Sequence, residues 1–116
     1  MQKSAIIDKK PYMLRAAYQW VVDNGWTPHL IVACPNVGWV GGLSEDFLQD
    51  EFLVLNISPS AAPDCLIEND YVFFSGRFKG ESCQVSVAME AVAALVAREN
   101  GQGFNFELPE NIKERP

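Results

Sequence analysis

Residues 8–34 read DKKPYMLRAAYQWVVDNGWTPHLIVAC, and the hydrophobic period changes within this stretch. Residues 8–24 predict a helix, because Asp8 is suited to cap it, Pro11 falls in its first turn and an Asn-Gly step ends it. Residues 29–34 are mostly apolar, stop at a proline and predict a buried strand.

The surface of the predicted helix is unusually apolar. Its polar side chains form a single line at a spacing of four residues, Arg15, Gln19 and Asp23. A helix on the surface of a monomer normally keeps a whole polar face, so this one needs two burial partners. We expect its own domain to be one partner and a second copy of the chain to be the other. The residues expected to contribute to such a homodimer contact are Tyr12, Leu14, Ala17, Tyr18 and Val21.

The chain beyond the first strand predicts a succession of short strands. They are expected at residues 52–57, 65–68, 71–78 and 82–87. The last two form a hairpin that turns at Lys79-Gly80. Residues 88–100 leave two readings open, since the alanines and Leu95 favour a helix by propensity, whereas Val92 and the short length allow a strand. We expect the folded domain to span 1–106 and a flexible, polar linker to start in 107–116.

Length and charge limit the classes of function. A chain of 116 residues with 48% hydrophobic residues has enough apolar surface for one core. The net charge of −6 argues against a nucleic-acid partner, because phosphates repel such a chain. No run of about 18 apolar residues occurs, so no membrane partner is expected. The three cysteines lie far apart and fit reduced thiols in the cytoplasm.

No residue pattern predicts catalysis. His29 is the only histidine, and no positioned acid or nucleophile accompanies it in the sequence. A zinc site would need His29 with Cys34, Cys65 and Cys83, whose spacing lacks the usual close pairs. We therefore expect no enzyme, no metal and no cofactor. A small hydrolase that uses Cys83 or Cys65 with His29 is the enzymatic alternative.

Five of the seven phenylalanines lie in the second half of the chain. They are Phe73, Phe74, Phe78, Phe104 and Phe106. Most are expected to be core residues. The alternative is that some of them line a groove for an extended peptide, which a strand edge would bind through main-chain hydrogen bonds.

Several segments resemble the stringent starvation protein B (SspB) family, whose members carry ssrA-tagged proteins to the ClpXP protease. The segment KPYMLRA at 10–16, with Trp20 and the run TPHL at 27–30, looks like the family's opening almost position for position. Further matching segments are LNI at 55–57, ND at 69–70, RF at 77–78, QVSV at 84–87 and ARENG at 97–101. These matches span nearly the whole chain in the right order.

The resemblance implies an α+β fold, mainly β, with an N-terminal helix on two small antiparallel sheets that form a partly open Sm-like barrel. It also implies a brief turn and a strand after Val87, a homodimer joined through the helix, and a groove that binds the polar part of the ssrA tag. The groove positions that match are Phe74, Ser75, Gly76, Arg77, Phe78, Asn105 and Phe106. Ser75 and Gly76 would offer main-chain hydrogen bonds, and Arg77 would attract the tag's acidic residues.

The chain departs from the family at three places. The loop from Val37 to Glu51 carries a Trp-Val-Gly-Gly run where the family has a Val-Pro step, and Asn105 stands where a methionine is common. The family also has a long acidic linker and a short motif that docks on ClpX, and neither occurs in these 116 residues. This chain is therefore expected to bind tags without tethering them to the protease. An Sm-like RNA-binding module is the alternative function.

Overall fold

The computed structural model describes residues 6–114, which form one helix, eight strands and three short 3-10 helices. The helix is α1 (Lys10–Asp23), and the strands are β1 (Pro28–Ala33), β2 (Val40–Gly41), β3 (Phe52–Asn56), β4 (Leu66–Ile67), β5 (Tyr71–Phe78), β6 (Glu81–Ala88), β7 (Val92–Ala97) and β8 (Gly103–Asn105). The 3-10 helices are η1 (Pro35–Val37), η2 (Glu45–Leu48) and η3 (Met89–Ala91).

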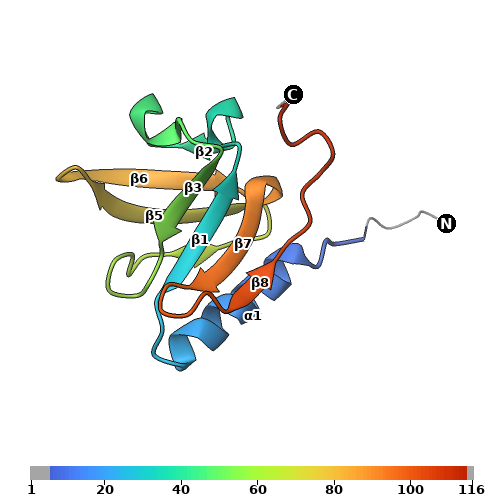
Figure 1. The fold of residues 1–116 in the computed structure, drawn as a ribbon, viewed down its shortest axis with the longest axis vertical. Coiled ribbons are helices and arrows are strands. Elements are labelled where there is room, and N and C mark those ends of the chain that lie inside the picture. Colours follow the sequence, from blue (N-terminus) through green and yellow to red (C-terminus); the bar gives the residue numbers. More distant parts are fainter. Residues whose placement is uncertain (1–5, 115–116) are drawn as a thin grey trace.

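The strands form two four-stranded antiparallel sheets. Sheet A has the order β3-β1-β7-β8, and sheet B has the order β2-β6-β5-β4. Figure 1 shows the strands of the two sheets crossing steeply, with α1 at the end occupied by β8. The α+β, mainly β class is confirmed, and the two sheets remain separate rather than closing into one barrel.

Facing rows of apolar side chains make the core between the sheets. In sheet A, Leu30 of β1 pairs with Leu55 on one side and with Leu95 on the other, and all three are buried. In sheet B, the buried pair Val72 and Val87 faces the same interior. Because side chains alternate across a strand, these rows fix the register of both sheets.

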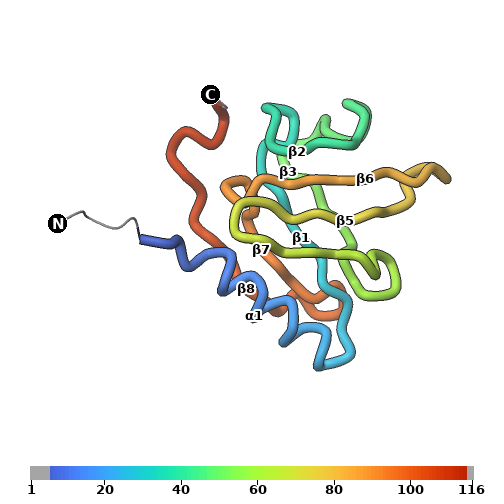
Figure 2. The backbone as a smooth tube through the Cα atoms, turned by 180° about the vertical axis from the view of Figure 1, so that it is seen from behind, coloured from blue at the N-terminus to red at the C-terminus, as the bar shows by residue number. Residues whose placement is uncertain are grey.

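Helix α1 begins two residues later than predicted. Lys9 occupies the N-cap position without a side-chain cap, while Asp8 accepts the N–H of Lys10 at 2.9 Å through its carboxylate. The buried helix residues recur every three or four positions and are Pro11, Leu14, Ala17 and Val21. That spacing places one stripe of the helix against the domain, and Figure 2 shows α1 running beside β8.

The two readings left open for residues 88–100 are resolved in favour of a strand. After η3, residues Val92–Ala97 form β7, which pairs with β1 on one side and β8 on the other. Two flanking strands bury four of its six residues, and this tertiary packing outweighs the helical propensity of the alanines. The hairpin turn at Lys79 and Gly80 is confirmed, and both residues have positive φ, 52° and 83°.

The C-terminal segment corrects the predicted domain boundary at 106. Ile112 is only 9% exposed and belongs to the hydrophobic core, and Leu108 packs against that core. The indole N–H of Trp39 donates to the main-chain carbonyl of Ile112 at 2.7 Å. The folded domain thus extends at least to residue 112, and Figure 1 shows this segment running from β8 toward the end that carries β2. Residues 115–116 lie outside the described part of the chain.

Candidate functional site

The predicted groove residues 74–78 are the last five of the eight residues of β5, where one edge of the strand is open. β6 pairs with β5 along its whole length, from Tyr71 to Phe78. On the other side, β4 pairs only with Val72 and Phe73. Figure 1 shows the tip of the β5–β6 hairpin reaching past β3, the edge strand of sheet A. The outer edge of β5 therefore lacks a neighbouring strand from residue 74 onward, among the residues that the structure describes.

Alternate residues of β5 direct their main-chain groups to opposite sides. The C=O of Tyr71 accepts a bond from Glu68 on the β4 side, so Ser75 and Arg77 also face this outer side. The N–H of Ser75 donates to the Asp64 carboxylate at 2.9 Å, and this bond lowers the pKa of Asp64. The N–H of Arg77 has no partner among the described residues. The open edge thus presents Ser75 and Arg77.

Gly76 differs from its predicted role. It is paired with Cys83 of β6, and the alternation along β5 turns its N–H and C=O toward that strand. A side chain at position 76 would instead point to the inner face of sheet B. A Cβ atom there would lie 3.1 Å from a ring carbon of Phe78 and 3.3 Å from one of Phe74. The rings of Phe74 and Phe78 therefore pack closely over Gly76, which offers no main-chain bond to a ligand.

The two phenylalanines beside Gly76 are buried to different degrees. Phe74 is 4% exposed and is a core residue, whereas Phe78 is half-buried. The ring of Phe78 packs edge-on against Phe47 of η2, with 5.4 Å between ring centroids. On the outer face, Arg77 is exposed and donates one guanidinium N–H to the C=O of Gly80 at 2.9 Å. Its remaining N–H groups are available to a ligand.

The other two predicted groove residues lie on a different sheet. Asn105 ends β8, and Phe106 follows it, with its N–H bonded to the C=O of Ala93 on β7. Both residues line a cavity of about 820 Å³ between the start of α1 and the segment after β8. None of residues 74–78 lines this cavity. The structure therefore brings the two predicted segments to a common core but not to one pocket.

Lys10 crosses this cavity and links three segments. Its ammonium group donates to the C=O of Glu90 at 3.3 Å and to the C=O of Glu107 at 3.4 Å. Burial lowers the pKa of Lys10 from 10.5 to about 8, and the negative charges of Asp8 and Glu90 oppose that shift. The amine thus holds the start of α1 against η3 and the C-terminal segment.

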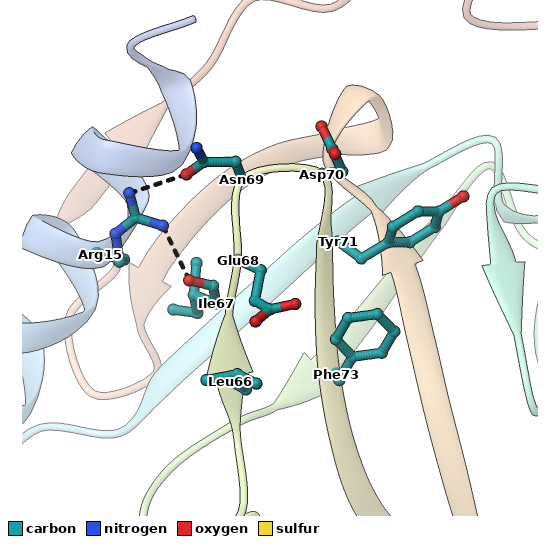
Figure 3. A pocket seen from close by; sticks show the side chains of 8 residues that line it. All are labelled: Arg15, Leu66, Ile67, Glu68, Asn69, Asp70, Tyr71 and Phe73. Carbon is teal, nitrogen blue, oxygen red and sulfur yellow. Dashed lines mark hydrogen bonds between the residues drawn. The ribbon is translucent and has the colours of Figure 1, made fainter. Parts of the chain in front are cut away.

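A second, shallower cavity of about 600 Å³ lies beside the turn between β4 and β5 (Figure 3). Arg15 reaches into it from α1 and donates to the C=O of Ile67 at 2.9 Å and to the side-chain oxygen of Asn69 at 3.1 Å. Its guanidinium also lies 4.5 Å from the ring centroid of Tyr12. Arg15 therefore clamps the helix to this turn instead of forming part of a solvated polar line.

Three of the residues predicted for the dimer contact are fully buried within the single chain. Leu14, Ala17 and Val21 are 0% exposed in the single chain, because they form the stripe that packs on the sheets. Tyr12 is 49% exposed, and Tyr18 is partly buried against the core. Tyr12 is therefore the most exposed of the five residues predicted for a helix contact, and the contact itself stays a prediction.

The exposed side of α1 carries an apolar stripe beside the polar residues Gln19 and Asp23. Met13 and Trp20 are 44% and 41% exposed, and Ala16 between them is exposed as well. Trp20 packs edge-on against Trp26 at 5.4 Å and against Phe104 of β8 at 6.1 Å between ring centroids. The spacing 13, 16, 20 would have identified this stripe once the buried stripe was known. Exposed apolar patches of this kind commonly mark interaction surfaces.

His29 and the cysteines do not come together. His29 lies on β1 opposite Asn56 and Val96, and burial lowers its pKa. Burial also raises the pKa of Cys65 to about 11, which disfavours the reactive thiolate. Among residues 6–114, no three His, Cys, Asp or Glu side chains are grouped to hold a metal ion. In the same range no helix has the length and apolarity needed to cross a membrane.

Comparison with known proteins matches this chain to one family. The sequence model described as "Stringent starvation protein B" matches residues 8–116. A relative named "Stringent starvation protein B homolog", from Haemophilus influenzae, is 43% identical over 104 residues, which cover 90% of this chain and 67% of the relative. These matches confirm the resemblance found in the sequence. The chain belongs to the stringent starvation protein B family.

Proposed function

We propose that this protein is a non-enzymatic adaptor that binds the ssrA degradation tag in the cytoplasm and presents tagged proteins to the ClpXP protease. Its membership of the stringent starvation protein B family supports the proposal. The single structural observation that carries it is the open outer edge of β5 at Ser75 and Arg77. An exposed strand edge binds extended peptides through main-chain hydrogen bonds, and neighbouring side chains supply selectivity.

In this proposal, the polar part of the tag lies extended along residues 74–78. Main-chain groups of Ser75 and Arg77 bond to the tag backbone, and the exposed guanidinium of Arg77 attracts its acidic residues. The half-buried ring of Phe78 receives an apolar side chain of the tag. Asn105 and Phe106 contribute from the cavity beside α1 only if the tag continues that far.

Delivery to the protease requires two further features. We propose that two copies associate through the exposed face of α1, with Met13, Ala16 and Trp20 at the contact and Phe104 beside them. We also propose that contact with ClpX is made by a tail that is absent from these 116 residues. The aligned region covers 67% of the Haemophilus influenzae relative, so the activity of a complete adaptor is part of the proposal.

A fluorescence anisotropy titration with a labelled ssrA peptide tests tag binding. We expect saturable binding of the tag and none of a scrambled peptide with the same composition. A labelled oligouridine in the same buffer at low salt tests the Sm-like alternative, because electrostatic binding to RNA is strongest there. Binding of the oligonucleotide without binding of the tag would replace the adaptor proposal with the RNA-binding one.

A further inference from the structure

The N–H of Ser75 is satisfied by a side chain at a place where a sheet would normally supply a main-chain carbonyl. β4 pairs Leu66 with Phe73, and two more steps in the same register put residue 64 opposite Ser75. The chain leaves the strand before that point, since β4 begins only at Leu66. The carboxylate of Asp64 then reaches back and accepts the Ser75 N–H at 2.9 Å. Asp64 therefore replaces the missing strand with one acceptor atom.

The hydrogen bond between Ser75 and the Asp64 carboxylate can open at a small cost in free energy. Asp64 is exposed, so rotation of its side chain returns the carboxylate to water without burying a charge. No movement of the backbone of β4 or β5 is needed. The bond lowers the pKa of Asp64, so the group that accepts the Ser75 N–H at neutral pH is an ionised carboxylate.

We propose that the Asp64 carboxylate occupies the position of a peptide carbonyl in the free protein. It accepts the Ser75 N–H there until a main-chain carbonyl of the bound peptide displaces it. This inference rests on the proposed function, because it assigns a regulatory contact to the same strand edge. An extended peptide that continues the line of β4 presents a main-chain carbonyl where the carboxylate now lies. Binding therefore exchanges one hydrogen bond for another, and the free protein keeps this edge capped against unspecific strand pairing.

Two substitutions of Asp64 separate the effect of its hydrogen bond on tag affinity from the effect of its charge. In Asp64→Ala the Ser75 N–H is free, so a peptide gains a bond without displacing one, and tag affinity should rise about fivefold. In Asp64→Asn the charge is gone, but the amide oxygen still accepts the Ser75 N–H. Affinity should then rise by no more than about twofold, because a neutral acceptor is weaker than a carboxylate but still has to be displaced.

Anisotropy titrations of the labelled ssrA peptide on the three proteins test this inference. An equal gain for Asp64→Ala and Asp64→Asn would assign the effect to charge and overturn the proposal. Unchanged or weaker binding by Asp64→Ala, while the wild type binds, would overturn it and leave the adaptor function intact. Failure of all three proteins to bind the tag would remove the adaptor function, and this inference with it.

Amide hydrogen exchange at Ser75 gives an independent measurement. We expect slow exchange in the free wild type, faster exchange in free Asp64→Ala, and slow exchange in both proteins at saturating tag. The amide of Val72, which lies within the β5–β6 ladder, serves as an internal control that should not change. A Ser75 amide that stays protected in peptide-free Asp64→Ala would contradict the inference.

Discussion

The indole N–H of Trp39 and the main-chain carbonyl of Ile112 form a buried hydrogen bond of 2.7 Å between positions 73 residues apart. Trp39 is 5% exposed and Ile112 is 9% exposed, so the bond lies among apolar side chains. It attaches the C-terminal segment to the short connection between η1 and β2. The segment that the sequence assigned to a flexible linker is therefore part of the folded domain.

We expect changes at this contact to lower the stability of the whole domain. Ile112→Ala removes buried apolar volume and should reduce the free energy of unfolding by about 2 kcal/mol. Trp39→Phe leaves the Ile112 carbonyl without this donor and should cost about 1 kcal/mol or more. Urea unfolding monitored by circular dichroism measures both effects. The exposed neighbour Lys113 provides the control, since Lys113→Ala should be nearly neutral.

The linker prediction was wrong because the partner of Ile112 is remote in sequence. A lone isoleucine in a polar tail gives no local signal, and Trp39 lies in a loop whose pairing depends on the tertiary fold. The hairpin at Lys79-Gly80 was predictable, since its turn chemistry is contained in two adjacent residues. Local patterns also fixed the helix, although not which of its two apolar faces turns inward.

The same distinction applies to the candidate site. The resemblance identified residues 74–78, but only the strand register decides that Ser75 faces the open edge and Gly76 faces β6. No sequence pattern marked Asp64 as the acceptor of the Ser75 N–H, because its side chain substitutes for a strand that is absent. Contacts that depend on where β4 begins cannot be read from composition or periodicity.

The lowered pKa of Lys10 predicts a gain of stability at alkaline pH. The pKa falls from 10.5 to about 8 on folding, so the unfolded chain binds more protons between these values. The contribution of Lys10 is therefore complete above pH 10.5 and is lost as the pH falls to about 8. Compared with Lys10→Met, the wild type should gain relative stability across this range. Thermal melts of both proteins at several pH values measure the difference.

The lowered pKa of Glu99 predicts a loss of stability at acidic pH. Its carboxylate accepts the N–H and the hydroxyl of Thr27, at 2.8 Å and 2.7 Å, and these bonds lower its pKa from 4.5 to about 2. The stabilisation is present above pH 4.5 and disappears as the pH falls toward 2. Glu99→Gln should therefore be less stable than the wild type at pH 7, with the gap closing through this acid range. A constant gap would show that the carboxylate charge is not involved.

The exposed apolar stripe of α1 predicts which substitution dissociates a homodimer without unfolding the chain. Ala16 lies between exposed Met13 and Trp20, so Ala16→Glu should give a folded monomer, because an unpaired charge at the contact is costly. Ala17 is 0% exposed, and Ala17→Glu should instead destabilise the fold itself. Light scattering and thermal melts on both variants distinguish these results. A wild-type chain that is monomeric at micromolar concentration would exclude the dimer.

The substitution Gly76→Gln is predicted to abolish tag binding without unfolding the protein. A glutamine there would press on the rings of Phe74 and Phe78 and displace the Phe78 ring that is proposed to receive a tag side chain. The ring contacts of 3.1 and 3.3 Å require small shifts, so stability should fall only modestly, while ssrA-peptide binding is abolished. Ser82→Gln, at an exposed position opposite Arg77, is the matched control and should bind normally. A folded Gly76→Gln variant with unchanged affinity would locate the site elsewhere.

Binding of the tag along the open edge of β5 is tested by mapping the bound peptide on the protein. Heteronuclear NMR spectra recorded during a titration with unlabelled ssrA peptide report on each backbone amide separately. We predict that the largest shift changes fall on the amides of Ser75 and Arg77, with smaller changes at Gly76 and Phe78. Changes confined to another surface, such as the exposed outer side of β3, or no change at saturating peptide, would exclude binding at this edge.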